Sequence, residues 1–367
     1  MNRDTHRVTI SASATSARRR RVVRALVAIA LLAVPVSLVA AGPGLAGSGW
    51  AAVAGAVRDV RVWWLAPIAL VWWLGLYAHS AVLTSALPGL SVRRALSLNL
   101  AGSAVANTVP MGGPVSVGLT SAMATSWGFS PPALGAFLAV STAWNVLARL
   151  VGGALGIGLL LVARPGAVSA ASLGWLVGAA VVGLVALGVV LASERSCARL
   201  GAVLGAGADR VSRLRRRDAH DRPGGYARAA MRVRRHIVHI LRRSWPAMSL
   251  GSVAYFALLC LLLDLCLRAL GSPAPLGLVL AAVGVERLVT AVPVTPGGAG
   301  VAELGLIACL SVGAVTQPDA VAAALLYRFF TFFLEIPVGT VVALTWGWHR
   351  RRASSLPAGL TTSSAAV

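Results

Sequence analysis

The chain has 367 residues, of which 57% are hydrophobic and 12% are charged, and its mean hydropathy is +0.79. A soluble globular domain carries about 25% charged residues, so the composition excludes that class and indicates a polytopic membrane protein. The formal net charge is +22. Because the arginines gather in segments between apolar runs, they indicate cytoplasmic loops beside anionic lipid, and no nucleic-acid partner is expected.

The first apolar run follows a basic segment. Residues 1–21 are polar and end in Arg18–Arg21, and the apolar run Ala25–Ala41 comes next. This order fits a cleaved secretory or twin-arginine signal, and it also fits a retained span held by the positive-inside rule. We favour the retained span, because further spans follow, with residues 1–21 as a disordered cytoplasmic tail. A second span, Val62–Leu83, returns the chain to the cytoplasm.

An interrupted stretch, V-P-M-G-G-P-V-S-V-G-L, occupies Val109–Leu119. Proline lacks the N–H of a continuing helix, and glycine permits backbone angles that other residues avoid. The flanking arms, Ala95–Val109 and Val115–Trp127, are both short for crossing a bilayer. They predict a helical hairpin near 95–127 that enters the membrane from the cytoplasmic side and returns to it.

Two long apolar runs complete the first membrane half, which we place at 22–193. The runs are Ala133–Val162, with Arg149 near its middle, and Ala170–Leu191. An arginine at that depth indicates a functional site, with a structural ion pair and a snorkelling side chain as the alternatives. We favour the functional interpretation, because Arg149 is far from both ends of its run.

An arginine-rich loop is predicted at 194–246, on the cytoplasmic side of the membrane. Its segment Arg228–Arg243 is either a solvated topology anchor or a basic amphipathic helix on anionic lipid, and the anchor is favoured. Residues 350–367 are expected to form a cytoplasmic tail, which begins with Arg350–Arg352 and continues with mostly small and polar residues.

The second membrane half, 247–349, contains two spans. The first, Ala247–Leu270, carries Asp264 and Arg268 at i, i+4, which predicts a structural pair on one helix face rather than a proton relay. The second, Pro318–Trp346, carries Arg328 and Glu335 at i, i+7, again on one face of a regular helix.

Between these two spans lies a second interrupted stretch, V-P-V-T-P-G-G-A-G-V-A-E-L-G-L, at Val292–Leu306. Pro293 and Pro296 are expected to break a helix, and a new helix is expected after Gly298. A turn at the membrane surface is the alternative to a re-entrant hairpin near 276–312. The apolar sequence on both sides favours the hairpin, which would enter from the outside.

The two interrupted stretches share the order V-P, G-G, V, G-L, and a long apolar run follows each of them. Hairpins of opposite orientation are the mark of an inverted repeat, a common build of membrane transporters. The sequence therefore predicts an all-α polytopic membrane protein with about six full spans and two re-entrant helical hairpins. We expect it in the plasma membrane with both termini in the cytoplasm.

A substrate site is expected where the two hairpin turns meet. Helix starts after Gly113 and after Gly298 offer free N–H groups, which favour an anion, and Arg149 and Arg328 add positive charge. Glu303 pairs with Arg328 or Arg287, or it holds an amine of a lipid headgroup. The predicted substrate-binding residues are Asn107, Gly112, Gly113, Arg149, Glu286, Arg287, Thr295, Gly297, Gly298, Glu303 and Arg328. Replacing Arg149 or Arg328 with alanine is predicted to abolish substrate movement without loss of protein.

The cysteines and histidines indicate no cofactor or metal. Cys197, Cys260, Cys266 and Cys309 follow neither a zinc pattern nor a disulfide framework, so we expect core thiols. The histidines form no H-E-x-x-H or similar array.

Three stretches carry a family resemblance: N-T-V-P-M-G-G-P-V-S, T-P-G-G-A-G-V-A-E-L-G-L and L-L-Y-R-F-F-T-F. They resemble the flippase-like membrane domain found at the N-terminus of lysylphosphatidylglycerol synthases, which also occurs alone. The likeness covers roughly Leu26 to Trp348, and the first stretch lacks the acidic residue of the commoner family pattern. The resemblance implies a stand-alone lipid translocator without the aminoacyl-transfer activity of the two-part synthases.

The predicted function is therefore translocation of an anionic phospholipid or a polyprenyl-linked lipid, without catalysis. A membrane enzyme acting on a lipid phosphate is one alternative, with Glu303 and Glu286 as candidate bases. A non-catalytic scaffold using the arginine-rich loop is the other. The sequence indicates no oligomeric state.

Overall fold

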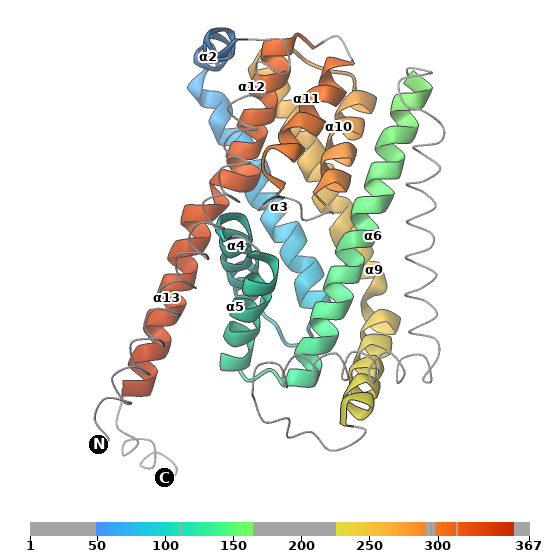
Figure 1. Ribbon diagram of the computed structural model, residues 1–367, viewed down its shortest axis with the longest axis vertical. Helices are drawn as coiled ribbons and strands as arrows, with labels where there is room; N and C mark the ends of the chain where they lie inside the picture. Colours follow the sequence, from blue (N-terminus) through green and yellow to red (C-terminus); the bar gives the residue numbers. More distant parts are fainter. Residues whose placement is uncertain are drawn as a thin grey trace, which may run out of the picture.

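The computed structural model describes residues 49–109, 112–163, 225–290, 295, 298–312 and 315–355. Throughout these ranges the regular elements are helices (Figure 1). The spans expected at Ala25–Ala41 and Ala170–Leu191 lie outside the described residues, and so do Pro293, Pro296 and Gly297. The described part of the chain is thus confirmed as helical, while the number of six spans stays a prediction.

Four helical stretches of the described chain are long and apolar enough to cross a membrane: Val62–Ala86, Pro131–Val162, Val233–Ala269 and Gln317–Arg352. They correspond to four of the spans predicted from the sequence. The first comprises the short 3₁₀ helix η1 (Val62–Trp64) and α3 (Leu65–Ala86). The second is α6 (Pro131–Ala163), and the third belongs to α9 (Gly225–Ala269).

Helix α9 begins before the predicted membrane boundary. It contains Pro246 and includes the basic segment Arg228–Arg243, which is therefore helical rather than an irregular loop. The fourth stretch is composite. It consists of α12 (Gln317–Arg328), the π-helical segment η3 (Phe329–Phe333) and α13 (Glu335–Ser355).

Two helix–turn–helix units lie where the interrupted stretches predict them. The first pairs α4 (Val92–Thr108) with α5 (Gly112–Ser126), and the second pairs α10 (Leu276–Val289) with α11 (Val301–Ser311). In the second turn Gly298 and Gly300 have φ of 72° and 85°, a region that side chains other than glycine avoid. Figure 1 shows the two units toward opposite ends of the long helices, with their turns near the middle.

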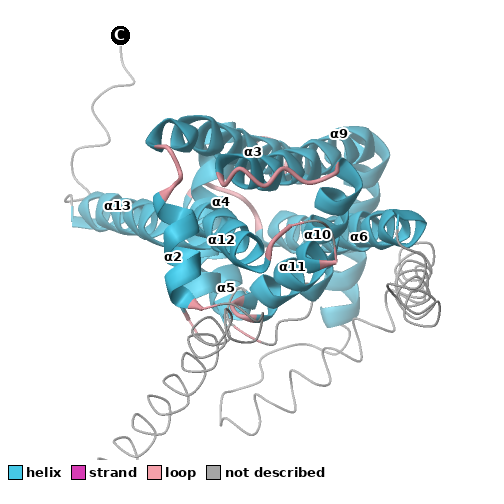
Figure 2. Cartoon of the chain, turned by 90° about the horizontal axis from the view of Figure 1, so that it is seen from above, coloured by secondary structure: helices cyan, strands magenta, loops and turns pink. Residues whose placement is uncertain are grey.

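The long helices pack in an exchanged manner. Helix α4 packs along α13, whereas α10 packs along α6, so each hairpin lies against the long helix that follows the other hairpin. Helices α3 and α9 pack against each other (Figure 2). A short helix, α2 (Trp50–Arg58), contacts α12 at one end.

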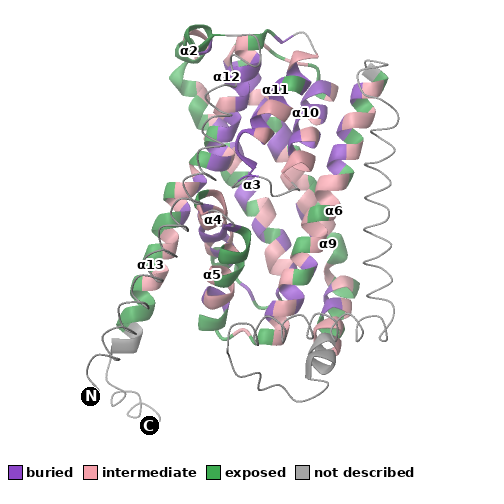
Figure 3. Cartoon of the chain, viewed as in Figure 1, coloured by how far each residue is buried: buried purple, intermediate pink, exposed green. Residues whose placement is uncertain are grey.

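The long helices bury some apolar side chains in the protein interior and expose others on the outer surface. One core cluster includes fully buried Leu263, Leu306 and Tyr327, on three different helices. Figure 3 shows buried residues gathered on α10, α11 and α12. By contrast, Val253 and Leu344 are 65% and 68% exposed on two candidate spans. Large apolar side chains on the outside of long helices are expected where lipid rather than water is the solvent.

The contact between α13 and α4 depends on the absence of a side chain at Gly339. A Cβ at this position would overlap the carbonyl oxygen of Leu100 and crowd Ala104. We expect Gly339→Leu to lower the unfolding temperature in detergent markedly, because overpacking a tight contact costs about 1–3 kcal/mol or more. Gly347 lies on the same helix with open space around it, so Gly347→Leu is the matched control. Equal unfolding temperatures for the two variants would contradict this packing.

Candidate functional site

A cavity of about 730 Å³ lies where the two hairpins meet. The end of α4 contributes Asn107 to its wall and the start of α5 contributes Gly113, while Thr290 and Gly298 come from the segment that follows α10. Helices α3, α6, α9, α12 and α13 complete the lining. The structure thus brings together two interrupted stretches that are far apart in the sequence.

Most of the residues predicted to bind substrate line this cavity. The lining members are Asn107, Gly112, Gly113, Arg149, Arg287, Thr295, Gly298 and Arg328. Glu286 and Glu303 do not line it; they are buried, with 0% and 4% of their surface exposed. Gly297 lies outside the described residues. The arginines are therefore the cavity-facing members, and these two glutamates lie behind them.

Arg149 reaches from α6 to the end of α10. Its Nε donates to Oδ1 of Asn145 at 3.0 Å, one turn earlier in the same helix. Its Nη1 donates to the carbonyl oxygen of Thr290 at 2.7 Å and to the hydroxyl of Thr290 at 3.1 Å. A cation at the C-terminal end of a helix is favoured by the helix dipole. No described carboxylate lies within ion-pair distance of Arg149, so its charge is held by neutral groups alone.

Two arginines and two glutamates form a compact ion cluster beside the cavity. Arg287 donates to both carboxylate oxygens of Glu286, through Nη2 at 2.6 Å and through Nε. Arg328 Nε donates to Oε1 of Glu303 at 2.8 Å, and Arg328 Nη1 lies 3.6 Å from Oε1 of Glu286. Buried charges require such partners, and the formal charges of these four residues cancel. Of the partners that the sequence left open for Glu303, the structure selects Arg328.

Glu303 also caps the start of α11. The backbone N–H of Gly300 donates to Oε2 of Glu303 at 2.6 Å. The start of α11 therefore already carries a negative group, which differs from the expectation that both helix starts are open to a ligand. Helix α5 has no acidic residue in its first turn, and Gly112, Gly113 and Pro114 at its start line the cavity. The two hairpins are thus unequal as anion sites.

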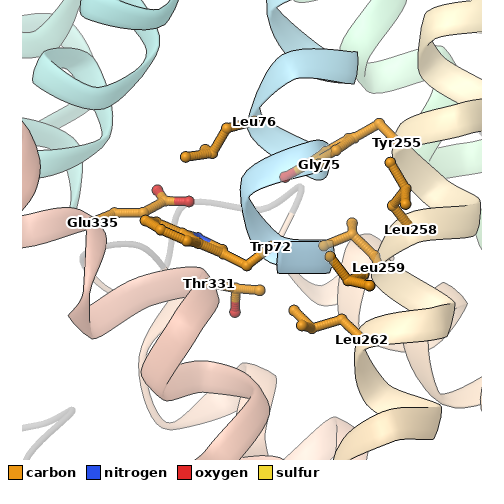
Figure 4. Close-up of a pocket in the computed structure, with 10 residues that line it drawn as sticks. Trp72, Gly75, Leu76, Tyr255, Leu258, Leu259, Leu262, Thr331 and Glu335 are labelled. Atoms are coloured by element: carbon orange, nitrogen blue, oxygen red, sulfur yellow. The ribbon is translucent and has the colours of Figure 1, made fainter. Parts of the chain in front are cut away.

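Glu335, His79 and Tyr255 also line the cavity but are not among the substrate-binding residues that the sequence predicts. Figure 4 shows the carboxylate of Glu335 beside the indole of Trp72, at a small neighbouring pocket that both residues line. The rings of His79 and Tyr255 are 5.0 Å apart. The sequence did contain a signal for Glu335 and His79, because an ionisable residue within an apolar span is a functional candidate by default.

The remaining lining is mixed in polarity. Hydroxyl and amide groups come from Asn99, Ser103, Ser141, Thr142, Asn145, Ser252 and Thr331. Phe256, Leu259 and Phe332 supply apolar surface. Such a lining suits a ligand that has a polar head and an apolar part.

The described residues contain no group of three or more His, Cys, Asp or Glu side chains placed to hold a metal ion. Cys260, Cys266 and Cys309 are buried and free, as expected of core thiols. The cavity wall offers hydrogen-bonding groups and arginine charge to a ligand.

A family model described as the lysylphosphatidylglycerol synthase TM region matches residues 22–339. The chain belongs to this family. The match includes both hairpins, Arg149, the ion cluster and Glu335, and it confirms the resemblance carried by the interrupted stretches. As a member of the lysylphosphatidylglycerol synthase TM-region family, the chain is a membrane protein associated with lipid handling. No curated protein matches it.

Proposed function

We propose that the chain moves an anionic phospholipid or a polyprenyl-linked lipid between the leaflets of the plasma membrane, without catalysing a chemical reaction. The observation that carries this proposal is the cavity between the two hairpin turns, with Arg149 in its wall. Its volume is in the range of small-molecule sites, which is about 300–1,000 Å³. A lipid headgroup fits such a space while the acyl chains stay in the surrounding bilayer.

Arg149 is the residue best placed to hold a phosphate. Its Nε and Nη1 are used by Asn145 and Thr290, whereas its Nη2 donates to no described residue. Arginine donors form strong, directional bonds to phosphate oxygens. The nearby start of α5 adds N–H groups and a favourable dipole for the same charge.

The arrangement of the hairpins supports a transport mechanism. Under this proposal both hairpins are re-entrant and are related by an inverted repeat. The exchanged packing, of α4 on α13 and of α10 on α6, supports the repeat. In such folds the site lies near the bilayer midplane, and rocking of one half against the other exposes it to each side in turn. With cytoplasmic termini, the first hairpin then enters from the cytoplasm and the second from outside.

An enzyme acting on a lipid phosphate is less well supported. Its candidate general bases, Glu286 and Glu303, are each bonded to an arginine, and neither lines the cavity. A general base must reach the proton that it removes.

Reconstitution into vesicles tests the proposal. We expect purified protein in vesicles containing fluorescently labelled phosphatidylglycerol to make the inner-leaflet label accessible to a membrane-impermeant quencher, because the cavity shields the headgroup during crossing. Vesicles without protein and vesicles with labelled phosphatidylcholine, whose headgroup has no net charge, are the controls. If label accessibility matches protein-free vesicles for phosphatidylglycerol, phosphatidic acid and a polyprenyl phosphate alike, the chain is not such a translocator.

A further inference from the structure

Glu335 occupies a special place in the last membrane-spanning stretch. It is the first residue of α13, which continues the span after the π-helical segment Phe329–Phe333. Its surface is 9% exposed, and it lines the central cavity. π-helical turns inside long helices are frequent at functional sites, because they re-aim side chains that a regular helix would place elsewhere.

The charged groups around Glu335 are already engaged with other partners. The charged or titratable groups that act on it are Arg287 of α10, Arg328 of α12 and Tyr255 of α9. Both arginines belong to the ion cluster with Glu286 and Glu303. Ser103 of α4 and Trp72 of α3 are its neutral neighbours, and His79 of α3 shares the cavity.

Arg149 and Glu335 are therefore the two charged groups of the cavity wall that form no ion pair with a described residue. They also occupy matching places in the two halves. The separation from Gly113 to Arg149 is nearly the same as that from Gly298 to Glu335. Arg149 lies on α6, which packs against α10 of the second hairpin. Glu335 lies on α13, which packs against α4 of the first hairpin. Within the cavity wall, Arg149 and Glu335 thus contribute one formal positive and one formal negative charge outside the ion cluster.

We propose that Glu335 takes up one proton when an anionic headgroup binds beside Arg149, so that lipid movement is coupled to proton movement. This inference rests on the proposed function. A phosphate bound beside Arg149 brings a second negative charge into the cavity that Glu335 lines, and repulsion between the two anions favours the neutral acid form of Glu335. At an effective dielectric constant of about 20, a unit negative charge about 10 Å from a carboxyl group changes the equilibrium constant of its protonation more than tenfold. By linkage, the proton then favours the lipid as much as the lipid favours the proton.

Calorimetric titration in buffers of different ionisation enthalpy measures this uptake directly. Dioctanoyl phosphatidylglycerol is titrated into the detergent-solubilised full chain at several pH values. We expect proton uptake approaching one per lipid, and an affinity that rises by up to about tenfold for each unit that the pH falls. Lipid binding without proton uptake would overturn the coupling and leave the proposed function standing. Absence of lipid binding would overturn both.

Variants assign the proton to its residue. Glu335→Gln mimics the protonated form, so it is expected to bind lipid with no proton uptake and no pH dependence, whereas Glu335→Asp restores both. Asp264→Asn removes a carboxylate that pairs with Arg268 away from the cavity, and it should behave as the unaltered chain. If uptake persists in Glu335→Gln but disappears in His79→Gln, the assignment to Glu335 is wrong.

Discussion

Replacing Arg149 with glutamine is expected to abolish lipid movement while the protein stays in the membrane at its normal level. The guanidinium is held by Asn145 and Thr290 and has no described carboxylate partner, so its removal leaves no buried charge uncompensated. What is lost is the bonding to a phosphate. Two hydrogen bonds to a charged group are worth about 3 kcal/mol or more, so the initial rate should fall at least roughly a hundredfold.

The measurement is the vesicle assay with variants matched for amount of protein. Arg268→Gln is the control. Arg268 is also an arginine on a membrane-spanning helix, but its side chain is 53% exposed and pairs with Asp264 on the same helix. Arg149→Lys should recover little of the rate, since an ammonium group cannot reproduce the planar set of donors. If Arg149→Gln instead disappears from the membrane while Arg268→Gln remains, Arg149 serves the fold rather than the substrate.

The sequence was informative about elements whose signals are local. Long apolar runs predicted the four described spans, because hydrocarbon requires about 20 apolar residues per crossing. Proline and glycine at Val109–Leu119 and Val292–Leu306 predicted the two hairpins, because these residues interrupt helices by their own geometry. The i, i+4 pair of Asp264 and Arg268 is confirmed for the same reason, since it depends only on a regular helix.

Local sequence signals could not predict the packing between distant parts of the chain. The exchanged packing of the hairpins is set by close approach at glycines such as Gly284, where a Cβ would meet the backbone of Gly152 at 2.7 Å. No local pattern identifies the partner of such a glycine. The continuation of α9 through Pro246 is likewise unexpected from propensity, because proline usually ends or kinks a helix.

The electrostatics of the site show the same limit. Sequence spacing could not decide between Arg287 and Arg328 as the partner of Glu303, because that contact joins α11 to α12 in space. The prediction that Arg328 and Glu335 share one helix face assumed a regular helical period. The π-helical segment between them changes the period, so i, i+7 spacing alone no longer places the two side chains on one face.

The ion cluster changes the expectation for Arg328. Its surface is 2% exposed, and its guanidinium contacts both Glu303 and Glu286. Replacing Arg328 with glutamine leaves buried carboxylates without their cation, which costs about 3–5 kcal/mol. We therefore expect Arg328→Gln to lower the amount of protein in the membrane and its unfolding temperature, unlike Arg149→Gln, although both arginines line the cavity.

A double-mutant cycle separates a role in folding from a role in transport. Glu303→Gln removes the carboxylate that Arg328 Nε contacts, and its amide oxygen can still accept from the N–H of Gly300. In the double variant Glu303→Gln, Arg328→Gln the remaining pair of Glu286 and Arg287 balances in charge. We expect the double variant to be more stable than Arg328→Gln alone, with a coupling free energy of about 1–3 kcal/mol in detergent unfolding. Additive losses would mean that the two side chains do not act as a pair. Stability recovered without transport would show that the pair of Arg328 and Glu303 also contributes to lipid movement, since both charges would then be absent from a folded protein.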